Sequence, residues 1–206
     1  MYDGLLLDVG GVLLDPWRAL DAYTVATGTP LQGRGPLDPE NDPLWQRCLA
    51  GELSFEAYWD RVAQTAGHPS WRAMFRSITD LVPDELFDPD GVALLREARA
   101  AGRRVGVLSN EAYTIQPRAF FDGRPEFDGM DAFVDSSDVG VRKPAPDSYL
   151  VAAKALGLAT ESIVFLDDAP ENVEGARAVG MFGIQVDPGH ASRAFATARE
   201  MLGLVN

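Results

Sequence analysis

Five short apolar segments, each of strand length, constrain the fold of this chain more than any other feature. They are residues 5–9, 105–108, 132–134, 163–166 and 182–186. Small or acidic residues end these segments, and patterns typical of amphipathic helices lie between them. Strands that are apolar on both faces and alternate with helices predict a parallel sheet covered on both sides. We therefore expect a doubly wound α/β fold.

Two of the helical patterns have clear ends. Residues 90–101 and 144–156 repeat apolar side chains at helical spacing, and Gly102 and Gly157 follow them as stop signals. We expect one helix in each range.

The alternation is interrupted once, between residues 15 and 87. This part contains all four tryptophans and a loop marked by prolines and glycines, and Ser54 opens a helical pattern that Gly67 closes. We expect an inserted helical domain whose aromatic side chains form a small core and which lies as a lid over one edge of the sheet. Residues 1–14 and 88–206 then form the sheet domain.

Composition excludes several classes of protein. Acidic residues outnumber basic residues 31 to 18, so we expect no nucleic-acid partner. A single cysteine, Cys48, and two separated histidines exclude a disulfide scaffold and a zinc site. No apolar run reaches membrane-spanning length, and the first basic residue, Arg18, follows three aspartates. We expect a cytoplasmic protein without a membrane partner, and its oligomeric state stays open.

Polar residues close several of the expected strands. Asp8 lies at the end of the first segment, Ser109 and Asn110 follow the second, and Asp167 and Asp168 follow the fourth. The carboxyl ends of parallel strands form one edge of the sheet, where ligands bind in such folds. We expect these groups to face one crevice.

Each candidate also has a purely structural interpretation. Asp8 can sit at a strand-to-loop turn, Ser109 can cap a helix, Asp168 with Glu171 can form a capping box, and Lys143 can be a solvated charge. A shared site is favoured by the set as a whole, because four separate loops would have to place compatible groups at the same end of the sheet.

Carboxylates grouped with a lysine and a hydroxyl favour phosphoryl chemistry. Several carboxylates held together repel one another, so we expect a divalent cation among them, and hard oxygen ligands suit magnesium. Magnesium often shares a substrate phosphate, while an ammonium and a hydroxyl contact phosphate oxygens. Asp8, on a glycine-rich turn, is the best candidate for a nucleophile that forms an aspartyl phosphate.

At these residues the sequence resembles the haloacid dehalogenase-like (HAD) hydrolase superfamily, in particular its members with an α-helical cap. The segments that carry the resemblance are residues 5–12, 107–110, 141–144 and 165–173, in the order of the family's motifs. The similarity covers nearly the whole chain. It implies a Rossmann-like core, a cap at residues 15–87, a magnesium cofactor and a small phosphorylated substrate.

The resemblance also implies a role for each site residue. Asp8 would be the nucleophile and a metal ligand, Ser109 would bind the transferring phosphoryl group, and Lys143 would balance its charge. The further implied metal ligands are the Gly10 carbonyl, Asp167 and Asp168; the further implied phosphate contacts are Gly11 and Asn110, with Asn172 in support.

One departure from the family pattern bears on activity. Family phosphatases carry a second aspartate two residues after the nucleophile, which protonates the leaving group and then activates water, and Gly10 stands at that position. A positioned acid or base typically contributes about a hundredfold to ten-thousandfold in rate. Asn172 also stands where some members have an acidic residue.

We therefore expect a magnesium-dependent phosphohydrolase whose leaving group needs little protonation, as in an acyl phosphate, or whose acid comes from the cap or the substrate. Asp15 is a nearby carboxyl, but capping of a helix led by Pro16 explains it better. The main alternative is a catalytically weak phosphate-binding or regulatory protein that has lost its proton shuttle.

Cleavage of carbon–halogen or carbon–phosphorus bonds is a lesser alternative. Dehalogenases of the family work without metal, which the paired aspartates argue against. Phosphonate cleavage in the family needs a cap lysine, and residues 15–87 contain no lysine.

Overall fold

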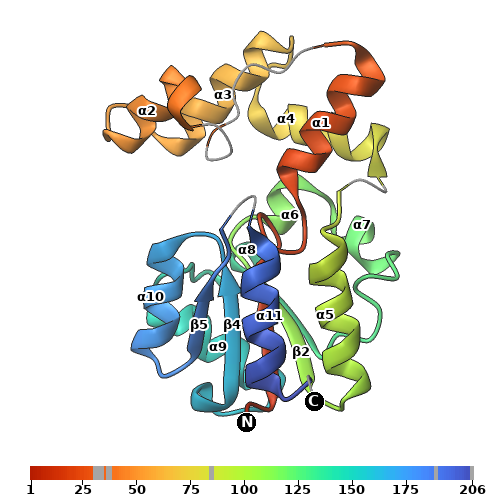
Figure 1. Cartoon of the computed structure of the whole chain (residues 1–206), viewed down its shortest axis with the longest axis vertical. Coiled ribbons are helices and arrows are strands. Elements are labelled where there is room, and N and C mark those ends of the chain that lie inside the picture. Colours follow the sequence, from red (N-terminus) through yellow and green to blue (C-terminus); the bar gives the residue numbers. More distant parts are fainter. Residues whose placement is uncertain (30–34, 36–38, 84–85, 188–189, 205–206) are drawn as a thin grey trace. The chain divides into compact units, whose positions relative to one another are not determined.

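The computed structural model describes residues 1–29, 35, 39–83, 86–187 and 190–204. The chain divides into two compact units, one made of Met1–Leu14 and Phe87–Asn206 and the other of Asp15–Leu86. We call the first the sheet unit and the second the helical unit, and describe each by itself. Figure 1 labels most of their elements.

The sheet unit is built on five parallel strands in the order β3-β2-β1-β4-β5. The strands are β1 (Gly4–Leu7), β2 (Arg104–Ser109), β3 (Ala132–Asp135), β4 (Ile163–Asp167) and β5 (Phe182–Gln185). β1 and β4 are buried along their whole length, as strands covered on both faces require. Because β1 pairs with β2 on one side and with β4 on the other, the ends of these three strands are neighbours.

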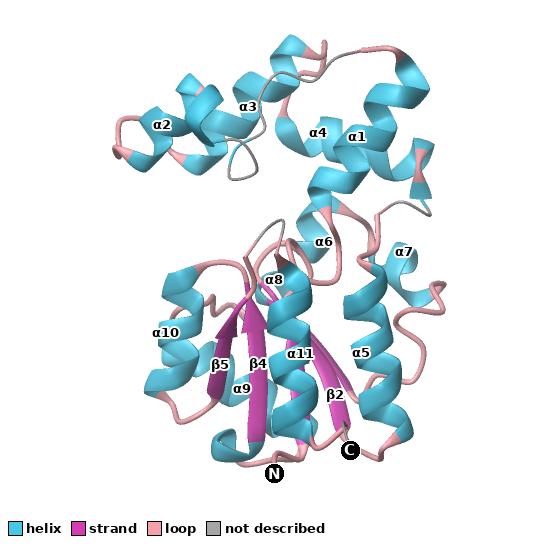
Figure 2. Cartoon of the chain, viewed as in Figure 1, coloured by secondary structure: helices cyan, strands magenta, loops and turns pink. Residues whose placement is uncertain are grey.

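Helices cover both faces of this sheet, as Figure 2 shows. On one face lie α9 (Pro146–Leu156) and α10 (Pro170–Ala178), and on the other lie α5 (Pro89–Ala100) and α11 (Ala191–Leu202). The connections contain α6 (Ala112–Ile115), α7 (Arg118–Asp122), α8 (Ser136–Val139) and the 3-10 turn η4 (Thr160–Ser162). The doubly wound α/β fold expected from the sequence is confirmed.

The two expected helix stops are glycines with left-handed backbone. Gly102 lies just beyond α5 with φ 74°, and Gly157 directly follows α9 with φ 70°. The start expected for the second helix, residue 144, is wrong. α9 begins at Pro146, because the preceding residues form a turn in which the Ala145 N–H donates to the Arg142 carbonyl at 2.8 Å.

β1 ends at Leu7, two residues before the expected end of the first segment. The Asp8 N–H still donates to the Leu166 carbonyl of β4 at 2.9 Å. The chain then turns, and the N–H groups of Leu13 and Leu14 both donate to the Val9 carbonyl. Asp8 is thus the last residue that the sheet holds in register.

The helical unit has a core of aromatic side chains. Its elements are α1 (Pro16–Thr27), the 3-10 turn η2 (Pro39–Asn41), α2 (Pro43–Leu49), α3 (Phe55–Thr65) and α4 (Trp71–Leu81). The Trp59 ring lies 5.1 Å from Trp17, 5.3 Å from Tyr58 and 5.4 Å from Phe75, measured between centroids. This packing agrees with the core expected for the aromatic residues of the insertion.

Asp15 caps α1, as the structural interpretation of this residue predicted. Its carboxylate accepts hydrogen bonds from the N–H groups of Trp17 and Arg18, both at 3.0 Å. Ser54 likewise caps α3, since its hydroxyl accepts from the Ala57 N–H at 3.1 Å. Both caps satisfy N–H groups that a helix N-terminus leaves without intrahelical partners.

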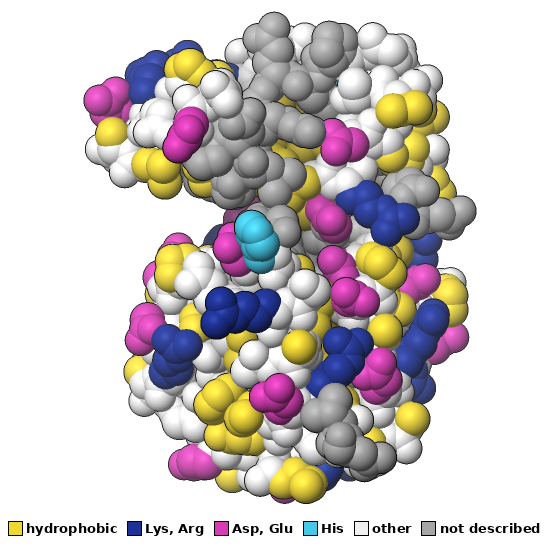
Figure 3. Space-filling view, viewed as in Figure 1, with side chains coloured by type: hydrophobic (Ala, Val, Ile, Leu, Met, Phe, Trp, Pro, Cys, Tyr) yellow, Lys and Arg dark blue, Asp and Glu magenta, His cyan; other side chains and the backbone are white. Residues whose placement is uncertain are grey.

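Among the described helices, none is both long enough and apolar enough to cross a membrane. On the described surface that Figure 3 shows, arginines and lysines are interspersed with acidic side chains.

Candidate active site

The carboxyl ends of three neighbouring strands bring together residues that are far apart in the sequence. Asp8 directly follows β1, Ser109 is the last residue of β2, and Asp167 is the last residue of β4. β1 lies between the other two strands. Asp8 therefore occupies the middle of the edge where we expected the site.

Lys143 joins the carboxylates of this edge. Its Nζ lies 2.6 Å from Oδ2 of Asp167 and 3.0 Å from Oδ1 of Asp8. The side chains of Lys143 and Asp167 have no exposed surface, so the interpretation of Lys143 as a solvated charge is wrong. A buried ammonium needs such partners, because desolvation of an unpaired charge costs several kcal/mol.

Burial and neighbouring charges raise the pKa values of two carboxyl groups in this cluster. Burial raises the pKa of Asp8 to about 6, and Asp167 adds to the shift while Lys143 opposes it. Burial raises the pKa of Asp168 to about 7, with Asp8 and Asp167 adding to it. For Lys143, burial acts to lower the pKa, but the two carboxylates outweigh burial and its pKa stands above the ordinary value. One ammonium thus does not neutralise the three carboxylates.

The carboxylates are grouped closely enough to hold a metal ion. Asp8, Asp167 and Asp168 each offer one oxygen, and these oxygens all lie within 4.8 Å of one another. An all-oxygen set with surplus negative charge fits a hard divalent cation. The group therefore has the chemistry of the metal site expected from the sequence.

Gly10 and Gly11 differ in what their backbone requires. Gly11 has φ 71°, and a Cβ built on it would lie 2.6 Å from Oδ2 of Asp168, so the chain passes the carboxylate at a distance that only glycine allows. Gly10 lacks a positive φ, and no atom of the described residues lies within 4 Å of a Cβ built there. The backbone would therefore accept an aspartate at position 10.

Asp167 is held from its other side by the start of α10. Its Oδ1 accepts from the Ala169 N–H at 3.0 Å and from Nδ2 of Asn172 at 2.9 Å. The Tyr149 hydroxyl donates to the Asn172 carbonyl at 2.7 Å. Asn172 thus supports the site through Asp167. The capping-box interpretation of Asp168 is wrong, because Ala169 is the N-cap of α10 and no side chain caps it.

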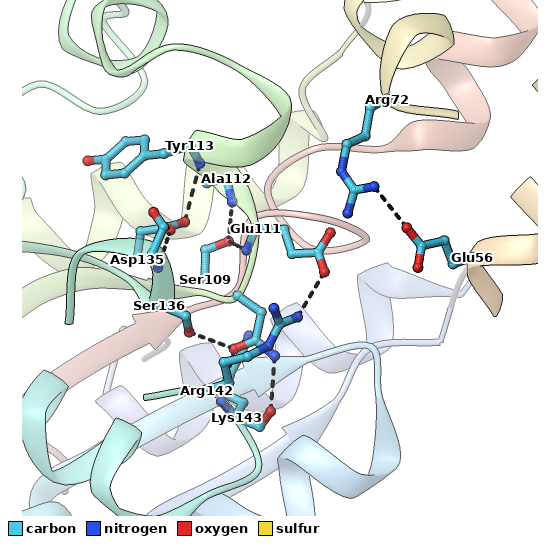
Figure 4. A network of polar contacts seen from close by, with 12 residues as sticks. Glu56, Arg72, Ser109, Glu111, Ala112, Tyr113, Asp135, Ser136, Arg142 and Lys143 are labelled. Atoms are coloured by element: carbon cyan, nitrogen blue, oxygen red, sulfur yellow. Dashed lines mark hydrogen bonds and ion pairs between the residues drawn. The ribbon is translucent and has the colours of Figure 1, made fainter. Parts of the chain in front are cut away.

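Ser109 presents its hydroxyl in a defined orientation. Its Oγ accepts from the N–H groups of Glu111 at 3.2 Å and Ala112 at 3.0 Å, as Figure 4 shows. The structural interpretation of Ser109 as a helix cap is wrong, because Glu111 is the N-cap of α6 and no side chain caps this helix; the two bonds hold the loop that leads into α6. Because the oxygen accepts both bonds, the hydroxyl hydrogen is directed away from these amides and can be donated to a substrate oxygen.

The Asn110 side chain has partners that the sequence did not indicate. Its Nδ2 donates to the Lys143 carbonyl at 3.0 Å, and its Oδ1 accepts from the Lys143 N–H at 2.9 Å. The phosphate contact expected of Asn110 stays a prediction, as do those of Gly11 and Ser109. Arg142, the neighbour of Lys143, pairs with Glu111 at 2.8 Å (Figure 4).

Sequence reasoning did not identify three contributors to the site. They are Tyr149, which lies in the expected helix at residues 144–156, Phe165, which lies in the expected strand and in the motif segment 165–173, and Ser136. The Phe165 ring centroid lies 5.6 Å from the Lys143 ammonium, and the Ser136 hydroxyl donates to Oδ1 of Asn110 at 2.9 Å. Local periodicity does not reveal such contacts, because each joins separate strands and loops.

Comparison with known proteins finds relatives that are named as phosphatases. A phosphatase from Mycobacterium tuberculosis is 39% identical over 99 residues, a stretch that covers 48% of this chain and 46% of that relative. The chain thus matches less than half the length of this relative. A sesquiterpene phosphatase from Aspergillus oryzae is 29% identical over 210 residues, covering 99% of this chain and 97% of the relative.

A solved structure supports the fold. The crystal structure of a HAD phosphatase from Thermococcus onnurineus aligns with a TM-score of 0.63 at 19% identity and covers 98% of each chain. The family model for haloacid dehalogenase-like hydrolases matches residues 2–180, which is most of the sequence. The resemblance inferred from the four motifs is confirmed, and this chain belongs to the haloacid dehalogenase-like hydrolase family.

Proposed function

We propose that this protein is a magnesium-dependent phosphohydrolase that forms an aspartyl phosphate on Asp8. Its substrate is a small phosphorylated metabolite with an activated leaving group. The observation that carries the proposal is the placement of the Lys143 ammonium 3.0 Å from Asp8 and 2.6 Å from Asp167. The phosphatase names of two relatives that differ in sequence add support.

Asp8, Asp167 and Asp168 would hold the magnesium, together with the Gly10 carbonyl. When bound, magnesium supplies positive charge that neutralises phosphate oxygens. Asp8 offers one carboxylate oxygen to phosphorus, while Lys143 stabilises the charge of the transferring group. Ser109 donates its hydroxyl hydrogen to a phosphoryl oxygen, and Asn172 keeps Asp167 in place.

The reaction has two steps. An oxygen of Asp8 attacks phosphorus, the bond between phosphorus and the leaving oxygen breaks, and the leaving group departs with the electron pair. Water then attacks the phosphorus of the aspartyl phosphate. The bond between phosphorus and Asp8 breaks, inorganic phosphate leaves with the protons of the water, and the Asp8 carboxylate is restored.

Gly10 determines the class of leaving group in this proposal. An alkoxide is strongly basic and needs a proton as it departs, and glycine has no side chain to supply one. A carboxylate that departs from an acyl phosphate needs none. We therefore place acyl phosphates, and other phosphates with weakly basic leaving groups, ahead of sugar phosphates. The helical unit is proposed to act as the cap that selects among them.

A second candidate function rests on the same glycine. A protein that lacks the proton shuttle can bind phosphate and a divalent cation with little turnover, as a binding or regulatory protein would. In that case magnesium raises the melting temperature only together with phosphate or a phosphorylated ligand. The cytoplasmic location and the absence of nucleic-acid and membrane partners remain predictions from the sequence.

Trapping of the covalent intermediate tests the first proposal. Protein is mixed with magnesium and acetyl phosphate labelled with radioactive phosphorus, and the reaction is stopped with acid. We expect protein-bound label that hydroxylamine releases, as it does from an acyl phosphate, and no label on Asp8→Asn. Asp138→Asn, which changes an exposed aspartate, serves as the control and should be labelled. Phosphate release that persists in Asp8→Asn would refute the proposal.

A further inference from the structure

We propose that Asn110 is a positioning residue that sets where Lys143 presents its ammonium. The inference rests on the proposed function, since it concerns the lysine that balances phosphoryl charge there. Asn110 follows Ser109 at the end of β2, whereas Lys143 lies in the turn before α9. The two residues come from different connections of the sheet unit.

The Asn110 carboxamide forms hydrogen bonds with both the carbonyl and the N–H of Lys143. Nδ2 of Asn110 donates to the Lys143 carbonyl at 3.0 Å, and Oδ1 accepts from the Lys143 N–H at 2.9 Å. Lys143 lies outside any helix or strand, so no regular ladder holds its main chain. A pair of opposed hydrogen bonds to one side chain fixes both the place and the direction of this peptide segment.

Asn110 is itself held in place. Ser136, a buried residue at the start of α8, donates its hydroxyl to the same Oδ1 at 2.9 Å. The carboxamide orientation is thereby defined, because an oxygen that accepts from the Ser136 O–H and the Lys143 N–H leaves the amino group facing the Lys143 carbonyl. The ends of β2 and β3 are thus connected to the segment that carries the lysine.

The position of the Lys143 backbone matters because its side chain has little freedom. The ammonium reaches Asp167 at 2.6 Å and Asp8 at 3.0 Å from a position without exposed surface. A shift of the backbone would lengthen one or both of these contacts. A displacement of about 1 Å at a reacting centre costs about a hundredfold in rate, even when the mutation lies elsewhere.

Only a carboxamide of this length meets the requirement. It combines a donor and an acceptor on one rigid plane, and these match the carbonyl and N–H of Lys143. An aspartate would turn an acceptor toward the Lys143 carbonyl. An alanine would leave both backbone groups without this partner.

The test uses three variants and two measurements. Asn110→Ala removes both bonds to Lys143. Asn110→Asp preserves the side-chain volume but replaces the Nδ2 donor with a second acceptor oxygen. It is the test variant if Asn110→Ala does not fold. Ser192→Ala, at an exposed position of α11, is the control, because it leaves Asn110 and its bonds to Lys143 and Ser136 unchanged.

The first measurement follows the lysine ammonium directly by nitrogen-detected NMR of the full chain. Only two lysines are present, so Lys154, an exposed residue of α9, is an internal reference. The buried, ion-paired ammonium of Lys143 exchanges its protons slowly and gives a sharp signal. We expect that signal to broaden or shift in Asn110→Ala and Asn110→Asp, to persist in Ser192→Ala, and the Lys154 signal to stay constant.

The second measurement is turnover of acetyl phosphate with magnesium, alongside the melting temperature. We expect kcat to fall about tenfold to a hundredfold in both Asn110 variants, and to change less than about threefold in Ser192→Ala. An unchanged Lys143 signal together with unchanged kcat in folded Asn110 variants overturns the inference. Absence of turnover in the wild type overturns the proposed function instead, and the NMR signal then decides the role of Asn110 by itself.

Discussion

Lys143 Nζ lies 2.6 Å from Oδ2 of Asp167, and neither side chain has exposed surface. Removing the ammonium would leave the buried carboxylate without its charged partner. Breaking a buried ion pair in this way costs about 3–5 kcal/mol. We expect Lys143→Met to lower the free energy of unfolding of the metal-free protein by an amount of that order, measured by urea denaturation. Lys154→Met, at an exposed position, is the control, and an equally small loss in both variants would argue against a tightly coupled pair.

The raised pKa of Asp168 predicts how the stability of the metal-free protein depends on pH. In the folded protein this pKa is about 7, whereas an unperturbed aspartate titrates at about 3.9. The folded state therefore binds the proton more tightly, so this residue's contribution to stability is lost as pH rises from about 4 to about 7. We expect Asp168→Asn to lose less stability than wild type across this range. Parallel curves of unfolding free energy against pH for the two proteins would contradict the raised pKa of Asp168.

We predict that position 11 requires glycine for two reasons, its left-handed backbone conformation and its close approach to Asp168. Gly11→Ala places a residue with a side chain at φ 71° and brings its Cβ against Asp168. Gly140→Ala is a matched control, because Gly140 has φ 74° but open space around it. The left-handed conformation costs roughly 1–2 kcal/mol in both variants. Only Gly11→Ala should also reduce the rise in melting temperature with magnesium; equal magnesium responses would refute the role given to Gly11.

Gly10→Asp is predicted to broaden the range of substrates. The position has room for the side chain, and the new carboxyl group could protonate a basic leaving group. We expect turnover of alkyl phosphates to rise by about a hundredfold or more, with little change for acetyl phosphate. Gly10→Asn has the same shape without the proton and should show no gain. A similar gain from both variants would show that the effect is not proton transfer.

The order of strands and helices could be predicted because each element leaves a local pattern in the sequence. Strands such as β4 are apolar throughout, and glycines such as Gly157 end helices with left-handed backbone. α11 was not predicted. Its buried residues are Ala194, Phe195, Ala198 and Leu202, and because two of these four are alanines, only two large apolar side chains mark its buried face.

The site could be predicted in part, because parallel strands place their carboxyl ends together. Asp8, Asp167 and Lys143 were expected at one edge, and the structure brings them within hydrogen-bonding distance. The two hydrogen bonds between the Asn110 side chain and the Lys143 backbone could not be predicted. It joins two irregular segments, and the sequence does not indicate which side chain will meet which backbone group.

The most direct test of the central claim is the rate of phosphate release from a panel that extends from acetyl phosphate to sugar phosphates, with magnesium and with a chelator. The account predicts turnover that the chelator abolishes and that is fastest on acetyl phosphate, because Asp8 transfers the phosphoryl group without a resident acid. Equal rates on acetyl and sugar phosphates would contradict the role assigned to Gly10. No release above the chelated control would contradict catalysis itself and favour the phosphate-binding alternative.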